Sequence, residues 1–341
     1  MGSFHFICMV KVTSVTQIYV FYVALCFDCL IYYLPEGINK MAKFQIFTDS
    51  CSELPTEVRK ELGIEYFPMG LVRNGKEMKA DIDWKDYSPH EFYDWMRNGE
   101  KLKTTQISVE TVCELSRPFL EKGIDILYLG CTVRLTGSIN SYNLAKEILL
   151  EEFPDRRMEA VETCTASGCE GMLACDAKRQ QDQGKSLDEV MAWVEENKNK
   201  YNYFCTADTL TYLKAAGRVS GAAAFFGNII GVKPVFISDK FGNNLVIGKA
   251  RGTKASMDMI VQGIKESMHP EEKEYALILH ADAPERAAAL KERFENELGI
   301  KKVIVSFMGP IVGITCGPGA FAGFCFGKEV TRFEGDGIAA K

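Results

Sequence analysis

The stretch IDILYLGCTVRLTGSINS (residues 124–141) combines the two patterns that decide the fold. Its first residues, Ile124–Leu129, form a mostly apolar run of the length expected for a buried strand. A polar turn follows, and the chain then continues as a predicted helix at Asn140–Glu152. Earlier in the chain, Phe44–Phe47 and Leu54–Leu62 show the same order of strand and helix. This alternation predicts a parallel sheet covered by helices on both faces.

Beyond about residue 200 the pattern changes. Val232–Ser238 and Asn244–Ala250 flank a Phe-Gly-Asn turn, which is typical of a hairpin. Hairpins among helices indicate an α+β layer with a mainly antiparallel sheet. We therefore expect an α/β protein with these parts: a leader at 1–40, an N-terminal α/β domain at 41–200, a C-terminal α+β domain at 201–330 and a tail at 331–341.

Local patterns add four expectations to this plan. Ile64–Arg73 is predicted to be one strand, and Asn74-Gly75 after it is a strong hairpin signal. Ala207–Gly217 is predicted to be a helix that Gly217 ends. Gly309–Ala320 is rich in glycine and proline amid apolar residues, so we expect a fixed loop that a ligand approaches closely.

The composition limits the class of protein. Hydrophobic residues make up 47 % and charged residues 25 % of the 341 residues, an ordinary balance for a globular chain. The net charge of −6 argues against nucleic acid as a partner, which calls for a surplus of Lys and Arg. The 12 cysteines and 4 histidines form no zinc-ligand set, so we expect no metal, no cofactor and buried thiols in a reducing cytoplasm.

The first forty residues carry an apolar run at Ile18–Leu34 that Asp28 interrupts. The codons for Glu36-Gly37 would form a purine-rich, ribosome-binding-like sequence shortly before Met41, so we expect a mis-assigned start with Met41 as the initiator. The alternatives are a membrane anchor, which would be at the short limit for a span, and a signal peptide.

Hydroxyl-bearing residues gather where predicted strands end. Thr104 lies in a Lys-Thr-Thr-Gln-Ile-Ser element, Thr136, Gly137 and Ser138 follow the 124–129 strand, and Ser167 follows the next predicted strand. In open α/β sheets, ligands bind outside the carboxyl ends of the strands, where helix N-termini offer free N–H groups. The elements together predict a small anion site built from neutral donors. The alternative for any single residue is a helix cap or a turn.

Two alternatives to simple binding remain open at this point. Ser50 or Ser138 could serve as the nucleophile of a stand-alone hydrolase if a general base lay beside it. A pocket too short for a lipid would instead favour a small-anion sensor. Arg218 and Arg251 are predicted either to be exposed ion-pair groups or to contact a partner.

The ordered set of motifs resembles the DegV family, whose members bind fatty acids. The resemblance covers residues 41 to about 330 and is carried by these elements: Thr48-Asp49-Ser50, the 103–108 element, Leu135-Thr136-Gly137-Ser138, the 166–171 element, Leu213 with Gly217-Arg218, Lys233-Pro234, and Gly313 with Gly317-Pro318-Gly319-Ala320. It implies a lipid tunnel between two domains, with Thr104 and Thr136 holding the carboxylate of a long-chain fatty acid.

The resemblance also implies the protein's partners. Family members present fatty acid to a separate ATP-dependent fatty acid kinase, so this chain is expected to be a carrier and not an enzyme. Membrane contact is expected only for lipid pick-up or if the leader is real. Thr315 stands where many relatives carry His; it donates a hydrogen bond but cannot carry charge. Thr136 and Ile107 stand where Ser and Pro are usual.

Overall fold

The computed structural model describes residues 44–220 and 231–332, which belong to one compact unit of the chain, Ala42–Lys341. The expectations for the leader at 1–40 and for most of the tail at 331–341 lie outside these described ranges. The chain passes from the first large sheet to the second between residues 162 and 201, and the domain boundary near residue 200 stays a prediction.

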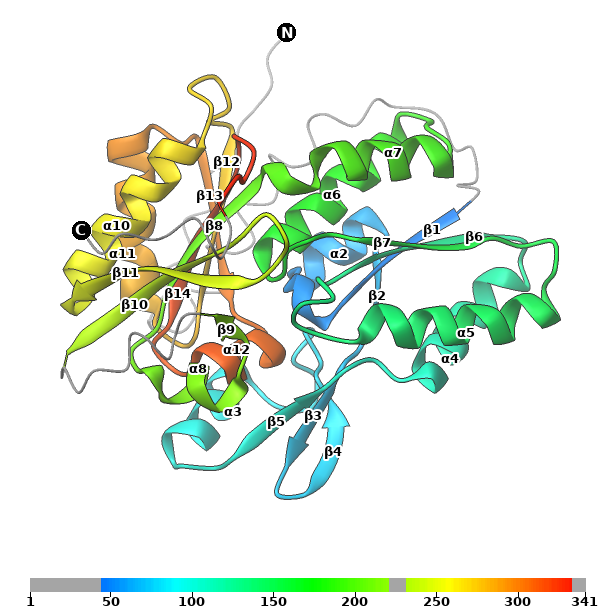
Figure 1. The fold of residues 1–341 in the computed structure, drawn as a ribbon, viewed down its shortest axis with the longest axis horizontal. Helices are drawn as coiled ribbons and strands as arrows, with labels where there is room; N and C mark the ends of the chain where they lie inside the picture. The colour runs from blue at the N-terminus through cyan, green and yellow to red at the C-terminus, as the bar shows by residue number, and fades with distance from the viewer. Residues whose placement is uncertain (1–43, 221–230, 333–341) are drawn as a thin grey trace, which may run out of the picture. The chain divides into compact units, whose positions relative to one another are not determined.

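The first large sheet is parallel, as the alternation of strands and helices predicted. Its strand order is β2-β1-β6-β7 (Figure 1). The strands are β1 (Phe44–Asp49), β2 (Glu65–Phe67), β6 (Asp125–Gly130) and β7 (Met158–Glu162). In register, Phe44 lies opposite Asp125 and Ile126 lies opposite Met158. The carboxyl ends of β6 and β7 therefore meet at one edge, which brings the loops after them together.

Helices cover both faces of this sheet. One face carries α4 (Val109–Leu120) and α5 (Ser138–Glu152), and the other carries α6 (Gly168–Asp182) and α7 (Leu187–Asn197), as Figure 1 shows. Residues 44–200 also contain α2 (Thr56–Leu62), α3 (Pro89–Arg97) and the short 3-10 helices η3 (Ser50–Ser52) and η4 (Lys198–Lys200). Ser88 and Glu91 form a capping box at the start of α3, with Pro89 at its first position, the sequence signature of a helix start.

The single strand expected at Ile64–Arg73 is wrong. The chain forms β2 in the parallel sheet and then β3 (Gly70–Arg73) in a separate antiparallel sheet with β4 (Lys76–Lys79) and β5 (Leu102–Thr105). Pro68 lies at the break and has no N–H for a ladder, and the N–H of Met69 donates to Ser50 Oγ at 3.0 Å instead. The Asn74-Gly75 hairpin is confirmed, with φ of 52° and 76° at its two residues.

The second large sheet has the order β13-β12-β14-β8-β10-β11-β9 and is mainly antiparallel, as predicted. Two neighbouring pairs, β12 with β13 and β11 with β9, are parallel. The strands are β8 (Tyr201–Thr206), β9 (Val219–Ser220), β10 (Val232–Ser238), β11 (Asn244–Arg251), β12 (Tyr275–His280), β13 (Lys302–Phe307) and β14 (Phe321–Phe326).

Two long helices, α10 (Gly252–Ser267) and α11 (Pro284–Leu298), pack on this sheet and enclose a core around Ile260, Phe294 and Phe321. The helix expected at Ala207–Gly217 is shorter, α8 (Leu210–Ala216), because Thr209 caps it by accepting from the N–H of Thr211 at 3.1 Å.

The loop expected at Gly309–Ala320 is wrong over its first part. Residues Pro310–Cys316 form the helix α12. Pro310 occupies the first helical position, where its missing N–H costs nothing, and Gly317 ends the helix with φ of 79°. Glycine and proline therefore mark the two ends of a short helix here, and the helix carries Thr315.

Candidate ligand pocket

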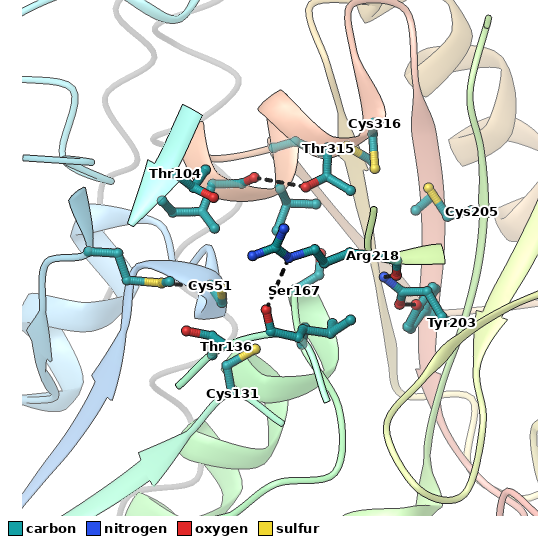
Figure 2. Close-up of a pocket in the computed structure, with 18 of the residues that line it drawn as sticks. Cys51, Thr104, Cys131, Thr136, Ser167, Tyr203, Cys205, Arg218, Thr315 and Cys316 are labelled. Carbon is teal, nitrogen blue, oxygen red and sulfur yellow. Dashed lines mark hydrogen bonds between the residues drawn. The ribbon is translucent and has the colours of Figure 1, made fainter. Parts of the chain in front are cut away.

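A pocket of about 130 Å³ lies where elements of the two large sheets and the small sheet meet (Figure 2). Its lining comes from segments far apart in the chain. The lining residues are Cys51, Met69, Thr104, Thr105, Gln106, Cys131, Leu135, Thr136, Gly137, Ala166, Ser167, Tyr203, Cys205, Arg218, Phe236, Asn244, Met308, Ile311, Val312, Thr315, Cys316, Ala322 and Phe324.

Four of the predicted hydroxyl groups line this one pocket. Thr104 lies in β5, placed by its register opposite Leu71 of β3. Thr136 and Ser167 lie in the loops after β6 and β7, which are neighbours in the parallel sheet. Thr315 comes from α12 and bonds the carbonyl oxygen of Ile311 at 3.4 Å. The structure thus brings together hydroxyls that are separated by up to 211 residues, from Thr104 to Thr315.

Gly137 and Ser138 play different parts beside Thr136. Gly137 lines the pocket at close quarters, since a Cβ added there would lie 2.3 Å from Gln106 Oε1. Ser138 is buried behind the lining, where its hydroxyl pairs with that of Thr136 at 2.8 Å and accepts from the N–H of Ile107 at 3.3 Å. Ser138 therefore braces the site instead of facing the pocket.

The two candidate arginines are far from equivalent. Arg218 lines the pocket, and Figure 2 shows its side chain projecting toward the group that includes Thr136, Ser167 and Thr315. Its Nε donates to Leu135 O at 3.3 Å and its Nη1 to Ala216 O at 2.6 Å. Arg251 is exposed at the start of α10, outside the pocket lining.

The rest of the wall is apolar and rich in sulfur. Tyr203, Phe236 and Phe324 present aromatic surface, and Cys51, Cys131, Cys205 and Cys316 present thiols. Contact with the Cys131 thiol and burial raise the pKa of Cys51 well above its usual value, and burial does the same for Cys205. Neutral thiols behave as small hydrophobic groups, so they suit the side of a pocket that faces an apolar ligand.

A buried carboxyl group at the back of the pocket was missed from the sequence. Glu53 is 3 % exposed, accepts from the N–H of Gly309 at 2.7 Å and accepts from the hydroxyl of Ser167. Burial raises the pKa of Glu53 to about 8, while these two hydrogen bonds act in the opposite direction. The local sequence signal was an acidic residue set between Ser52 and Leu54-Pro55, which by itself does not indicate burial.

Asp49, at the end of β1, positions two of the wall residues. Its carboxyl group accepts from the N–H of Cys51 at 2.8 Å, the N–H of Cys131 at 3.2 Å and the hydroxyl of Tyr128 at 2.6 Å. Burial raises its pKa, and these hydrogen bonds oppose the change. The Thr48-Asp49-Ser50 segment thus joins β1 to the loop after β6 behind the pocket.

Other features bear on metals and membranes. Among the described residues, His90, Asp94 and Asp282 are the one group of side chains close enough to share a metal ion. Arg97 already pairs with both carboxylates, at 2.9 Å and 2.6 Å.

In residues 44–220 and 231–332, no helix combines the length and apolar character needed to cross a membrane.

Comparisons with known proteins agree on one family. Residues 43–328 match the family model described as "Uncharacterised protein, DegV family". A DegV domain-containing protein of Clostridium perfringens is 35 % identical over 289 residues, which cover 84 % of this chain and 98 % of that protein. A solved structure, described as fatty acid binding of a DegV family protein from Thermus thermophilus, has 29 % identity and a TM-score of 0.74 and covers 84 % of this chain and 99 % of its own.

Proposed function

Because this chain belongs to the DegV family, we propose that it binds a long-chain fatty acid in the pocket and presents the carboxylate to a separate ATP-dependent fatty acid kinase. The observation that carries the proposal is the pocket itself. The hydroxyls of Thr104, Thr136 and Thr315 line the same cavity as the aromatic and thiol side chains. A mainly apolar lining with a few polar groups suits a ligand with a polar head and an apolar tail. The fatty acid bound by the Thermus thermophilus relative supports the same assignment.

The head group needs donors because a buried carboxylate without partners is costly. Thr104 and Thr136 supply neutral O–H donors, and Gly137 leaves room for close approach. Arg218 adds positive charge at the same pocket, while its Nε and Nη1 are engaged with backbone carbonyls. We infer that this arrangement leaves one carboxylate oxygen free to accept the phosphoryl group from ATP, with ADP as the leaving group.

The tail supplies most of the binding free energy. Burying about 14 methylenes at ~0.8 kcal/mol each is worth on the order of 11 kcal/mol. The cavity of about 130 Å³ is similar in size to one that holds a benzene molecule, so a long chain requires more room. We infer that the apolar wall around Phe236 and Phe324 separates to extend the pocket into a tunnel between the two halves.

The two serines that a hydrolase could use as nucleophiles are already hydrogen-bonded, which favours a carrier role. Ser50 donates to Ala80 O at 2.8 Å and accepts from the N–H of Met69, so its hydroxyl is fully engaged behind the pocket. Ser138 is engaged with Thr136 and Ile107. The nine cysteines of the described ranges are free thiols, which supports a reducing, cytoplasmic setting.

Native mass spectrometry of the full chain tests the function. We expect a stoichiometric adduct with the mass of a fatty acid, and a weaker adduct for Thr136→Ala. Thr253→Ala, in α10 and outside the pocket lining, is the matched control and should retain the lipid. A protein that stays free of ligand after incubation with stearic acid, yet takes up a short carboxylate such as butyrate, would support a small-anion sensor instead. Phosphate transfer is then tested by adding a fatty acid kinase and ATP.

A further inference from the structure

Glu53 lies directly behind the hydroxyl of Ser167, a residue of the pocket lining. It ends η3 in a left-handed conformation, with φ of 53°, and this turns its side chain into the interior. Ser167 also has positive φ, 59°, with ψ of −148°, a conformation that is strained for residues other than glycine. Glu53 and Ser167 both have positive φ, and their side chains are hydrogen-bonded to each other. This combination indicates a contact that the surrounding fold enforces.

The surroundings of Glu53 contain no balancing cation among the described residues. Its oxygens accept from Ser167 and from the N–H of Gly309 at the start of α12. Two titratable groups of other packed elements feel the charge of Glu53, the phenol of Tyr93 on α3 and the thiol of Cys205 on β8. Burial raises the pKa of both well above the usual values, so both are neutral. Glu53 itself, with its pKa raised to about 8, holds a proton at neutral pH.

The proton on Glu53 decides what Ser167 offers to a ligand. A serine hydroxyl has one hydrogen to donate. When Glu53 is ionised, Ser167 donates that hydrogen to Glu53 and presents only lone pairs to the pocket. When Glu53 is protonated, the carboxyl group donates to Ser167 Oγ, and the hydroxyl hydrogen of Ser167 is released toward the pocket. The N–H of Gly309 can donate to the other oxygen of Glu53 in both states.

We propose that Glu53 is a proton-holding positioning residue for the fatty-acid head group, which turns the hydroxyl of Ser167 toward the carboxylate and makes binding conditional on its own proton. This inference rests on the proposed function and assigns a role to a residue outside the predicted hydroxyl set. Ionised Glu53 would also place a second negative charge behind the bound carboxylate, where burial strengthens repulsion. Both effects favour the protonated form in the complex.

The consequence is a linkage between pH and affinity. Because the ligand favours protonated Glu53, affinity is full below about pH 8 and falls as the pH rises above it, by up to about tenfold per pH unit. Reciprocally, binding raises the pKa of Glu53, so the protein takes up a proton with the fatty acid when the pH is near or above 8.

The test compares the full-length protein and three variants with vaccenic acid at about pH 6.5, 8 and 9.5. Glu53→Gln is a mimic of the protonated state, because its amide donates to Ser167 Oγ and its carbonyl oxygen accepts from Gly309. Ser167→Ala removes the donor. Glu170→Gln is the matched control, since Glu170 is an equally buried carboxyl group that bonds Thr48 at 2.7 Å and lies outside the pocket lining.

At each pH we divide the wild-type affinity by the affinity of Glu53→Gln, so that any pH effect on the fatty acid itself cancels. We expect this ratio to fall about tenfold between pH 8 and 9.5. Glu170→Gln should follow the wild type, and Ser167→Ala should bind more weakly at low pH. Calorimetry of the wild type in two buffers of different ionisation enthalpy should show proton uptake at about pH 8.5, independent of any variant's folding.

A wild-type protein that binds vaccenic acid with no proton uptake, or with a constant ratio to Glu53→Gln, would overturn the role of Glu53 and leave the proposed function standing. If Glu170→Gln lost the pH effect, that effect would belong to Glu170, which would contradict the role of Glu53. Absence of binding by every protein at every pH would overturn the role of Glu53 and the proposed function together.

Discussion

The hydroxyl of Tyr93, in α3, donates to the carbonyl oxygen of Met308 at 2.7 Å, and both residues are completely buried. This bond joins the N-terminal half of the chain to the segment that leads into α12. Met308 also lines the pocket, so the bond fixes part of the wall.

Tyr93→Phe should therefore lower the free energy of unfolding by about 1–3 kcal/mol, the cost of leaving a buried carbonyl oxygen without its donor. Urea denaturation measures this change. Tyr142→Phe, in α5 and outside the pocket lining, removes another tyrosine hydroxyl, which is bonded to Glu159 O at 3.2 Å, and serves as the control. We expect Tyr93→Phe alone to weaken fatty-acid binding, and equal affinities for the two variants would contradict a role for this bond in shaping the pocket.

Gly137→Ala should weaken fatty-acid binding by about tenfold while lowering stability by only about 1 kcal/mol. The backbone of Gly137, with φ of −88°, accepts alanine, but the new Cβ would lie 2.3 Å from Gln106 Oε1. Gln106 must then leave its hydrogen bond to Ser141 Oγ, 2.8 Å long, and shift into the pocket. Isothermal titration with fatty acid measures the loss.

The double variant with Gln106→Ala removes the obstructing side chain and provides the control. Recovery of affinity in the double variant is the expected result. A double variant as weak as Gly137→Ala would show that the added methyl group itself blocks the ligand.

Glu53→Gln should also change stability in a pH-dependent manner, with or without ligand. The folded-state pKa of Glu53, about 8, lies above the ordinary value of 4.5, so the folded protein holds a proton that the unfolded chain releases. The contribution of Glu53 to stability is full below about pH 4.5 and is lost as the pH rises to about 8. Across this window, the free energy of unfolding of Glu53→Gln should rise relative to that of the wild type by up to about 1.4 kcal/mol per pH unit. Denaturation curves at several pH values measure the difference, and a constant difference would show that Glu53 is ionised in the folded protein.

His280 should make the free energy of unfolding fall as the pH is lowered, the opposite pH dependence to that of Glu53. It is 5 % exposed, its Nδ1 accepts from the N–H of Ala283 at 3.1 Å, and burial lowers its pKa to about 4. The folded protein therefore keeps His280 neutral, and this stability is full above about pH 6.5 and is lost as the pH falls to about 4. His280→Gln should flatten that part of the stability profile. His90, which is exposed at the surface, is the control, and an equal effect of His90→Gln would contradict this assignment.

Sequence patterns located several hydroxyl-bearing residues of the pocket because these residues follow predicted strands. Thr136 and Ser167 come after two predicted strands, and the pairing of β6 with β7 brings their loops to one edge. Thr315 was placed by its motif, although its segment proved to be a helix. In that segment, glycine and proline are compatible with both a loop and a capped helix, and packing decides between them.

Glu53 could not be predicted in this way. Its partners Ser167 and Gly309 lie 114 and 256 residues further along the chain, so no local pattern records their contact. The division of Ile64–Arg73 into two strands was missed for a related reason. Pro68 was a visible warning, but the acceptor that draws the N–H of Met69 away from a ladder is Ser50, which is distant in sequence.

The position of β14 has a consequence for how the chain is made. This strand lies in the interior of the second sheet, between β12 and β8, and pairs with both. Since a ribosome releases the chain from its N-terminus, β8 and β12 emerge well before the strand that separates them. Until β14 is synthesised, β8 and β12 each have one edge whose backbone N–H and C=O groups lack their partner strand. Because these strands are rich in apolar residues, such edges can pair with other nascent chains. Synthesis of this protein should therefore depend on chaperones until the last strand is inserted.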